Sequence, residues 1–130
     1  MDLGTLDYLY APSSDVAADV RWFAEKLGAE VRFAVESGGV RVAMLRVGEA
    51  ATPLVLTDHL PDERPILVYR VAGLEAATDG LRSRGWTPDA SIELPMGPAT
   101  TFSAPGGLRL AIYEASRPFV VESMVGRRDF

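Results

Sequence analysis

Very few residues in this sequence could carry nucleophilic or metal chemistry. The chain has one histidine, His59, one lysine, Lys26, and no cysteine. A facial triad for non-haem iron needs two histidines, and thiolate metal sites and cysteine nucleophiles need cysteine, so the sequence excludes these sites. His59 lies beside Asp58, with Asp62 and Glu63 close by. We expect a solvated histidine in a polar linker here rather than a metal ligand.

Asp7 is the carboxylate that best suits acid–base chemistry, because it lies in the first expected strand, Thr5 to Ala11. If Asp7 faces the interior, apolar surroundings raise the pKa of its carboxyl and make it a weak candidate for a general acid or base. If Tyr8 faces inward instead, Asp7 is a surface charge that protects a strand edge from aggregation. The sequence leaves both orientations open.

A Pro-Gly-Gly turn precedes a strand in which side chains alternate between two faces. The face expected to lie on the core consists of Leu108, Leu110 and Ile112. The other face carries Arg109, Ala111 and Tyr113, a mixture of cation, methyl group and phenol that is typical of a pocket floor. Arg109 would bind an anionic or carbonyl group there, or reach solvent at the rim.

Length and composition favour one soluble domain without nucleic acid or membrane partners. The chain has 130 residues, of which 48% are hydrophobic, and a net charge of −5. The acidic balance argues against binding to a phosphate backbone. No apolar run approaches the roughly 20 residues of a membrane span, and no signal peptide opens the sequence. Together with the absence of cysteine, this leads us to expect a cytoplasmic protein.

The expected elements occur in the same order twice, as strand, helix and three strands. Asp15 is expected to cap the first helix, and Gly28 to end it. After the strand at Thr5–Ala11, the first series continues with a helix at Val16–Leu27 and strands at Glu30–Glu36, Val40–Val47 and Leu54–Thr57. The second series consists of a strand at Ile66–Val71, a helix at Leu74–Arg84, and strands at Ala90–Leu94, Thr100–Ser103 and Leu108–Tyr113.

Three local patterns in this order resemble the vicinal oxygen chelate superfamily, which includes glyoxalase I, bleomycin-resistance proteins and extradiol dioxygenases. They are the first helix end at Trp22–Val31, the second helix at Val71–Gly85 and the hairpin at Ala104–Leu110. The resemblance implies an α+β fold in which two βαβββ modules form a curved mixed sheet, or cup, with a helix packed on the outside of each module. A single domain would span 1–130, with modules at about 1–60 and 61–115 and a C-terminal tail at 116–130.

The resemblance also locates the metal ligands of the family's metal-dependent members, on the first and last strands of each module. The corresponding positions are Asp7 or Tyr8, then a position near Val55, then Ile66, and finally Ala111 where the family normally has glutamate. Val, Ile and Ala have no donor atoms, so at most one ligand survives. We therefore expect no metal and no cofactor.

The resulting hypothesis is a protein similar to the bleomycin-resistance type, which binds a hydrophobic or aromatic small molecule, such as an antibiotic, without chemistry. We expect a homodimer, in which the tail covers the partner or closes a pocket. A metal-dependent or cofactor-free lyase, isomerase or dioxygenase is the first alternative, and a non-catalytic structural dimer module is the second. The expected ligand-binding residues are Tyr8, Tyr10, Val55, Thr57, Ile66, Phe102, Arg109, Ala111 and Tyr113.

Overall fold

The structure is a computed structural model that describes residues 3–60 and 64–130. Asp62 and Glu63, two acidic residues of the expected linker, lie outside the described residues. Contacts divide the chain into two units, and the division falls within the first strand. Residues up to Asp7 group with Ile66–Ser123, whereas the chain from Tyr8 to Pro65 groups with Met124–Phe130.

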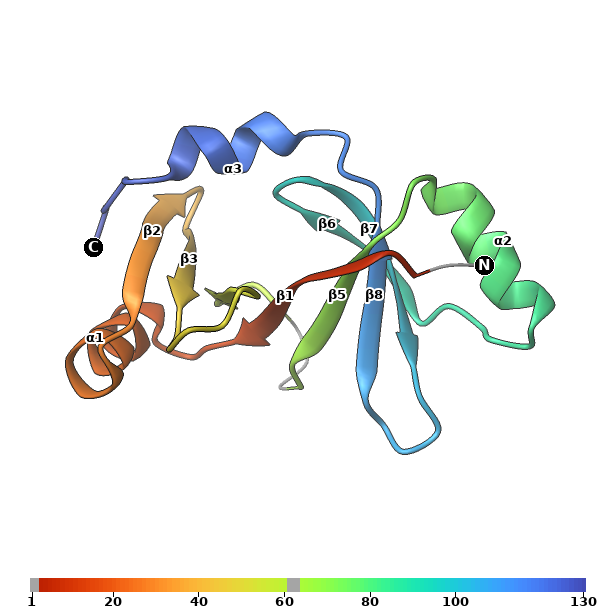
Figure 1. The fold of residues 1–130 in the computed structure, drawn as a ribbon, viewed down its shortest axis with the longest axis horizontal. Helices are drawn as coiled ribbons and strands as arrows, with labels where there is room; N and C mark the ends of the chain where they lie inside the picture. The colour runs from red at the N-terminus through yellow and green to blue at the C-terminus, as the bar shows by residue number, and fades with distance from the viewer. Residues whose placement is uncertain (1–2, 61–63) are drawn as a thin grey trace. The chain divides into compact units, whose positions relative to one another are not determined.

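The first module contains one helix and four strands, in the order that the sequence predicts (Figure 1). Its elements are β1 (Thr5–Pro12), α1 (Val16–Leu27), β2 (Glu30–Ser37), β3 (Val40–Arg46) and β4 (Leu54–Thr57). The strands lie in the order β2-β3-β4-β1. β1 pairs with β4 in parallel, whereas β3 is antiparallel to both of its neighbours.

Local signals explain where α1 begins and ends. The Asp15 carboxylate accepts a hydrogen bond of 3.0 Å from the Ala18 N–H, which satisfies a free donor of the first turn. Gly28 ends the helix in a left-handed conformation, with φ at 65°. Val16 and Val20 then pack on a buried cluster of Ala34, Ala43, Leu45 and Leu56 from the sheet.

Replacing Asp15 with Ala should lower the free energy of unfolding by about 1 kcal/mol, because the Ala18 N–H loses its acceptor. Urea denaturation followed by circular dichroism measures this change. Glu25→Ala is the matched control, since Glu25 is an exposed acidic residue of the same helix. An Asp15→Ala midpoint equal to that of the control would contradict the capping role.

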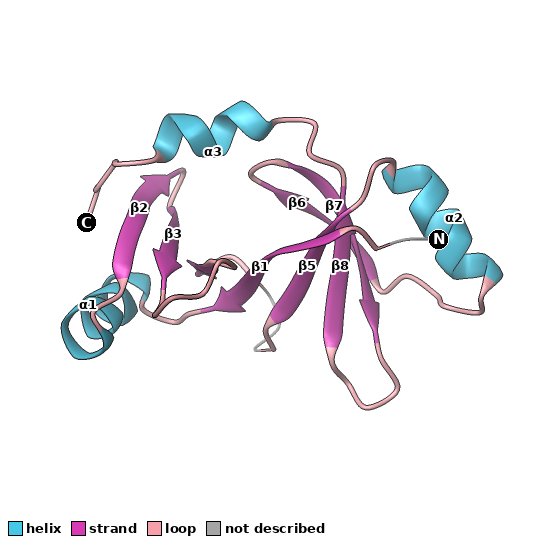
Figure 2. Cartoon of the chain, viewed as in Figure 1, coloured by secondary structure: helices cyan, strands magenta, loops and turns pink. Residues whose placement is uncertain are grey.

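The second module repeats the same series. Its elements are β5 (Ile66–Arg70), α2 (Leu74–Ser83), β6 (Ala90–Leu94), β7 (Gly97–Ser103) and β8 (Arg109–Tyr113), and the strand order is β5-β8-β7-β6. α2 packs on its own sheet through Ala77 and Leu81, which contact Phe102 and Ile112. The α+β class, with two βαβββ modules and one helix packed on each, is confirmed (Figure 2).

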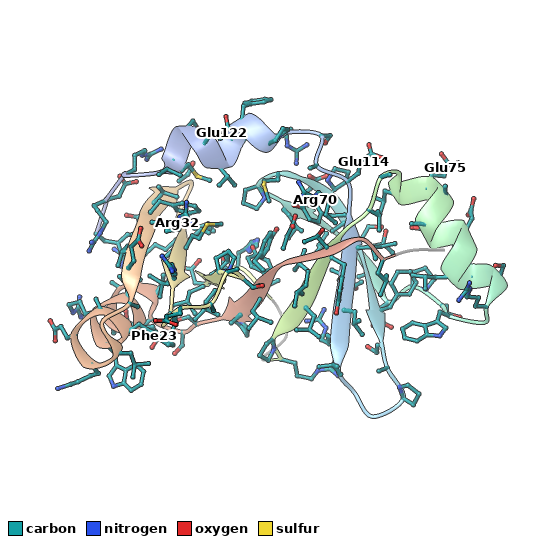
Figure 3. All side chains as sticks on the ribbon, in the orientation of Figure 1. Phe23, Arg32, Arg70, Glu75, Glu114 and Glu122 are labelled. Atoms are coloured by element: carbon teal, nitrogen blue, oxygen red, sulfur yellow. The ribbon has the colours of Figure 1, made fainter. Side chains whose placement is uncertain are left out.

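The start of α2 is capped by a residue from a distant strand end. Gly73, at the capping position, has no side chain to offer. Instead, Glu114 follows β8 and its Oε1 accepts a hydrogen bond of 3.1 Å from the Leu74 N–H (Figure 3). A carboxylate at a helix N-terminus is also favoured by the helix dipole. Glu114 thus connects β8 to the helix of its own module.

Ile112 lies in the core as expected, but the expectations for Leu108 and for the start of β7 are wrong. Leu108 lies before β8 and is 55% exposed, whereas Arg109 is 8% exposed and Ala111 and Tyr113 are fully buried. The face with Arg109, Ala111 and Tyr113, which we expected to form a pocket floor, is therefore more buried than Leu108. β7 also begins earlier than expected, because Gly97 pairs with Leu94 across a two-residue turn.

The C-terminal tail contains a third helix, α3 (Pro118–Met124), and then runs beside β2. The Ala34 N–H donates to the Arg127 carbonyl at 2.9 Å, and the Asp129 N–H donates to the Ala34 carbonyl at 2.7 Å. The Arg41 guanidinium lies 4.8 Å from the centre of the Phe130 ring. We expected the tail to cover a partner or close a pocket, but its last residues pair with this chain's own β2.

Candidate functional site

In each module, the sheet face away from the helix holds most of the expected ligand-binding residues. Alternation along the strands assigns them, because neighbouring side chains point to opposite faces. In the first module this face contains Tyr8, Tyr10, Val55 and Thr57, which are 3%, 0%, 3% and 0% exposed. Tyr10 pairs directly with Val55 across β1 and β4.

In the second module, the corresponding face is built from β5, β8 and β7 in register. Val68 of β5 pairs with Ala111 of β8, which pairs with Thr101 of β7. All three side chains are fully buried. Beside this row the same face continues with Ile66 and Arg109 on one side and Arg70, Tyr113 and Ala99 on the other. We call these eight residues the helix-free face of the second module.

Phe102 does not belong to the helix-free face. We expected it among the ligand-binding residues, but Phe102 pairs with Leu110 and points toward α2, where it contacts Ile112 and the other core residues. The apolar residues of β7 occupy both faces, so the sequence alone does not show which face Phe102 joins.

Asp7 of β1 contacts two residues of the helix-free face, Tyr113 and Arg70. The Tyr113 hydroxyl donates a short hydrogen bond to the Asp7 carboxylate. The Arg70 Nε lies 3.4 Å from the same carboxylate oxygen. The Asp7 side chain remains 14% exposed and that of Arg70 52% exposed, so a small molecule can approach the carboxylate. Burial, followed by the hydrogen bond to Asp7, raises the pKa of Tyr113 far above its usual range, which keeps the phenol protonated.

A close backbone contact brings the start of β1 to the end of β5. Gly4 has φ at 67°, and a Cβ at that position would lie 2.1 Å from the Arg70 carbonyl oxygen. Only glycine fits this contact without displacement. Asp7 follows three residues later and meets the Arg70 side chain. Asp7 therefore contacts Tyr113 and Arg70 of its own unit, whereas Tyr8 is 3% exposed and belongs to the other unit.

Arg109 carries a buried donor without an acceptor. Arg109 is 8% exposed, and its Nη1 has no hydrogen-bond partner within residues 3–60 and 64–130. A buried donor left without an acceptor costs free energy. A bound ligand with a carboxylate or carbonyl oxygen would remove that cost, which agrees with the role expected for Arg109.

His59 takes part in a hydrogen-bonded group that the sequence does not reveal. The Tyr10 hydroxyl and His59 Nε2 are joined by a hydrogen bond of 2.9 Å, and Thr57 Oγ1 lies 3.3 Å from Nδ1. His59 is exposed, as expected, but its ring is held against buried Tyr10. The two residues lie 49 positions apart, so no local pattern predicts the contact. Burial raises the pKa of Tyr10 to about 12.

The raised pKa of Tyr10 predicts a loss of stability at high pH. Tyr10 binds its proton more tightly in the folded state, so its contribution is complete below pH 10 and is lost as the pH rises from about 10 to about 12. The loss in the free energy of unfolding is about 3 kcal/mol. Denaturation at several pH values measures it. In Tyr10→Phe this loss of stability should be absent. If the free energy of unfolding of Tyr10→Phe fell between pH 10 and pH 12 as steeply as that of the unaltered protein, Tyr10 would not be the group responsible.

The residues at the family's metal positions do not fit a metal ion. These positions hold Asp7 or Tyr8, then Val55, Ile66 and Ala111, and only the first of them, as a carboxylate or a phenol, has a donor atom in its side chain. Among the described residues, no three His, Cys, Asp or Glu side chains lie close enough to hold a metal. We therefore derive no chemical step through a metal.

None of the helices within residues 3–60 and 64–130 has both the length and the apolar character of a membrane span.

Comparison with known proteins identifies the fold. No protein-family model and no curated protein sequence matches the chain. Among solved structures, methylmalonyl-CoA epimerase from Mycobacterium tuberculosis matches 88% of this chain and 89% of its own, with 21% identity and a TM-score of 0.66. That epimerase is a vicinal oxygen chelate protein. This chain has the vicinal oxygen chelate fold.

Two further structures share the vicinal oxygen chelate fold with this chain. Methylmalonyl-CoA epimerase in complex with methylmalonyl-CoA and NH4+ has 18% identity and a TM-score of 0.67, with 88% of this chain and 96% of that chain covered. The hypothetical protein BH1468 from Bacillus halodurans C-125 has 12% identity and a TM-score of 0.69, with 85% and 93% covered. Identities at this level show the fold alone.

Proposed function

We propose that this chain is a metal-independent enzyme that moves a proton on a small carbonyl-containing molecule, as an isomerase or lyase does. The observation that carries the proposal is the contact of Asp7 with the Tyr113 hydroxyl and with Arg70. A partly exposed carboxylate held by a phenol and a guanidinium is fixed in position and can act as a base. Ala111 stands where the metal-dependent members of the superfamily that the sequence resembles have glutamate, and its side chain has no donor atom.

In the proposed reaction, an Asp7 carboxylate oxygen accepts a proton from the carbon next to the substrate carbonyl. The electron pair of the broken C–H bond moves to the carbonyl oxygen and returns when the carbon is reprotonated. Arg109 lies four residues before Tyr113 on the same face, about 13 Å away along the strand. That distance is too long for a small substrate to reach Arg109 while its reacting carbon contacts Asp7, so we assign Arg109 no part in the proposed proton transfer.

The fold comparison supports this class of reaction. Several structural neighbours are epimerases, and one structure contains methylmalonyl-CoA. Those proteins share at most 21% identity with this chain, so the similarity supports a reaction class rather than a substrate. The absence of donor atoms at Val55, Ile66 and Ala111 is the reason that we propose a reaction without metal.

Solvent deuterium exchange tests the proposal directly. The protein is incubated in D2O with methylmalonyl-CoA, and separately with small 2-substituted 3-oxo acids, and mass spectrometry follows deuterium at the carbon next to the carbonyl. We expect exchange that continues unchanged in the presence of a chelator. Exchange that stops with the chelator would contradict the metal-independent mechanism, and no exchange with any of these probes would count against the enzyme.

Binding without chemistry is the second candidate function, and the unpaired Arg109 Nη1 favours it. The ligand would be a hydrophobic or aromatic molecule with an acidic or carbonyl group, and acidic aromatic antibiotics belong to this class. Isothermal titration calorimetry with aromatic carboxylates distinguishes this function from the enzyme. We expect binding that Arg109→Met abolishes, and we expect no deuterium exchange in the bound ligand.

We also propose a homodimer and a cytoplasmic location. The exposed apolar side chains of α1, Trp22 at 51% and Leu27 at 50%, support a dimer, because burying them would be favourable. Size-exclusion chromatography with light scattering tests the dimer. A monomer at all concentrations would contradict it.

A further inference from the structure

A cavity lies in the second module, on the α2 side of the sheet. Its volume is about 250 Å³, and it is separated from the helix-free face by the sheet itself. The cavity is lined by Leu3, Leu81, Arg84, Trp86, Phe102, Leu110 and Ile112. Nothing in the proposed proton transfer uses these residues.

The cavity combines a rigid apolar floor with an accessible aromatic wall. Phe102 and Ile112 are each 1% exposed and belong to the packed core beneath α2. Trp86 is 37% exposed and lies against Phe102, with ring centroids 6.3 Å apart and planes tilted by 59°. A bound apolar group would cover the exposed indole surface and remain in contact with both rings.

Arg84 supplies the charge at this cavity. The carbonyls of the last turn of α2 are already satisfied, since Leu81 O accepts from the Trp86 N–H at 3.0 Å and Arg82 O accepts from the Gly85 N–H at 3.0 Å. Arg82 pairs with Asp79 at 3.8 Å. Across residues 3–60 and 64–130, by contrast, no acidic side chain forms an ion pair with Arg84.

We propose that this cavity is a binding site for a small apolar monocarboxylate, whose hydrocarbon part lies between Leu81, Trp86 and Phe102 and whose carboxylate pairs with Arg84. The volume is just below the roughly 300–1,000 Å³ of sites for drug-sized ligands, so the ligand is smaller than these. Charge complementarity selects an acid, because the lining contains a cation and no anion.

Trp86 fluorescence tests the site with 3-phenylpropanoate as the probe. In a Trp22→Phe background, Trp86 is the remaining tryptophan, since the chain has two. We expect a saturable change in emission at millimolar probe or below. We expect Trp86→Phe, which retains Trp22 on α1 in the first module, to show no such change.

Arg84→Gln and Arg82→Gln form the matched pair of variants in this background. Arg84→Gln should weaken binding of 3-phenylpropanoate about three- to tenfold, because an exposed charge pair is lost. Arg82→Gln should leave it unchanged, since Arg82 does not line the cavity. 3-Phenylpropan-1-ol should bind the unaltered cavity more weakly than the acid by a similar factor.

Three results would overturn the proposal: no saturable change in the Trp22→Phe protein, equal affinity for the acid and the alcohol, or equal weakening by both arginine variants. Leu110→Phe, which fills the cavity, should abolish binding while the circular dichroism spectrum is retained, and full binding by that folded variant would also overturn the site. Asp7→Asn should bind the probe normally, so failure of this proposal and failure of the proposed enzyme are distinguishable.

Discussion

Replacing Asp7 with Asn should lower the rate of solvent deuterium exchange by about 10²- to 10⁴-fold, because the proposed general base is removed. Asn has the same shape as Asp and retains a carbonyl oxygen that can accept the Tyr113 hydrogen bond. Substrate binding should therefore change little. Mass spectrometry of the probe after incubation in D2O measures the rate.

Asp89→Asn is the matched control for this experiment. The Asp89 carboxylate likewise accepts a hydrogen bond from a hydroxyl of the second module, that of Ser103, but the contact is exposed and lies away from Tyr113. The control should exchange deuterium at the unaltered rate. If Asp7→Asn matched the control, Asp7 would not be the base, and binding without chemistry would become the better description.

Replacing Gly97 with Ala should lower the free energy of unfolding by about 3 kcal/mol, near the upper end of the usual cost of overpacking. A Cβ at this position would lie 2.1 Å from the Glu114 carbonyl oxygen. That carbonyl accepts the Ser116 N–H, and the Glu114 side chain caps α2, so the backbone here cannot move without disturbing both contacts. Denaturation by guanidinium chloride measures the loss.

Gly106→Ala is the control for the Gly97 variant. A Cβ on Gly106 would meet no atom within 4 Å, and the residue lies in the turn before β8. Its free energy of unfolding should change by no more than about 0.5 kcal/mol. Equal midpoints for the two variants would show that the close approach of Gly97 to Glu114 does not constrain the fold.

Local chemistry explains which elements the sequence predicts well. Asp15 and Gly28 bound α1 because their preferences act within a few residues. β4 and β6 have the bounds expected from apolar runs between turn residues. The duplicated order of elements then supports a two-module α+β fold, since each element is detected by its own residues.

The candidate site depends on contacts that no local pattern contains. Tyr113 and Asp7 are 106 positions apart. A period of two shows that Arg109, Ala111 and Tyr113 share a face, but it does not show which face a helix covers. The same ambiguity explains why the sequence does not place Phe102 on the α2 side of the sheet, because apolar residues occupy both faces of β7.

The pairing of the tail with β2 has a consequence for dividing this chain into its repeats. The Asp129 carboxylate accepts a hydrogen bond from the Glu36 N–H, 93 residues away in the sequence. The tail that follows the second module therefore pairs with β2 of the first module. β1 is divided as well, since Asp7 groups with Ile66–Ser123 whereas Tyr8 groups with the rest of the first module. If the chain were cut between the two modules, β2 would lose the tail and keep unpaired N–H and C=O groups at a sheet edge. Such an edge can pair with another copy of the fragment. Repetition in the sequence therefore does not mark units that can be separated and used alone.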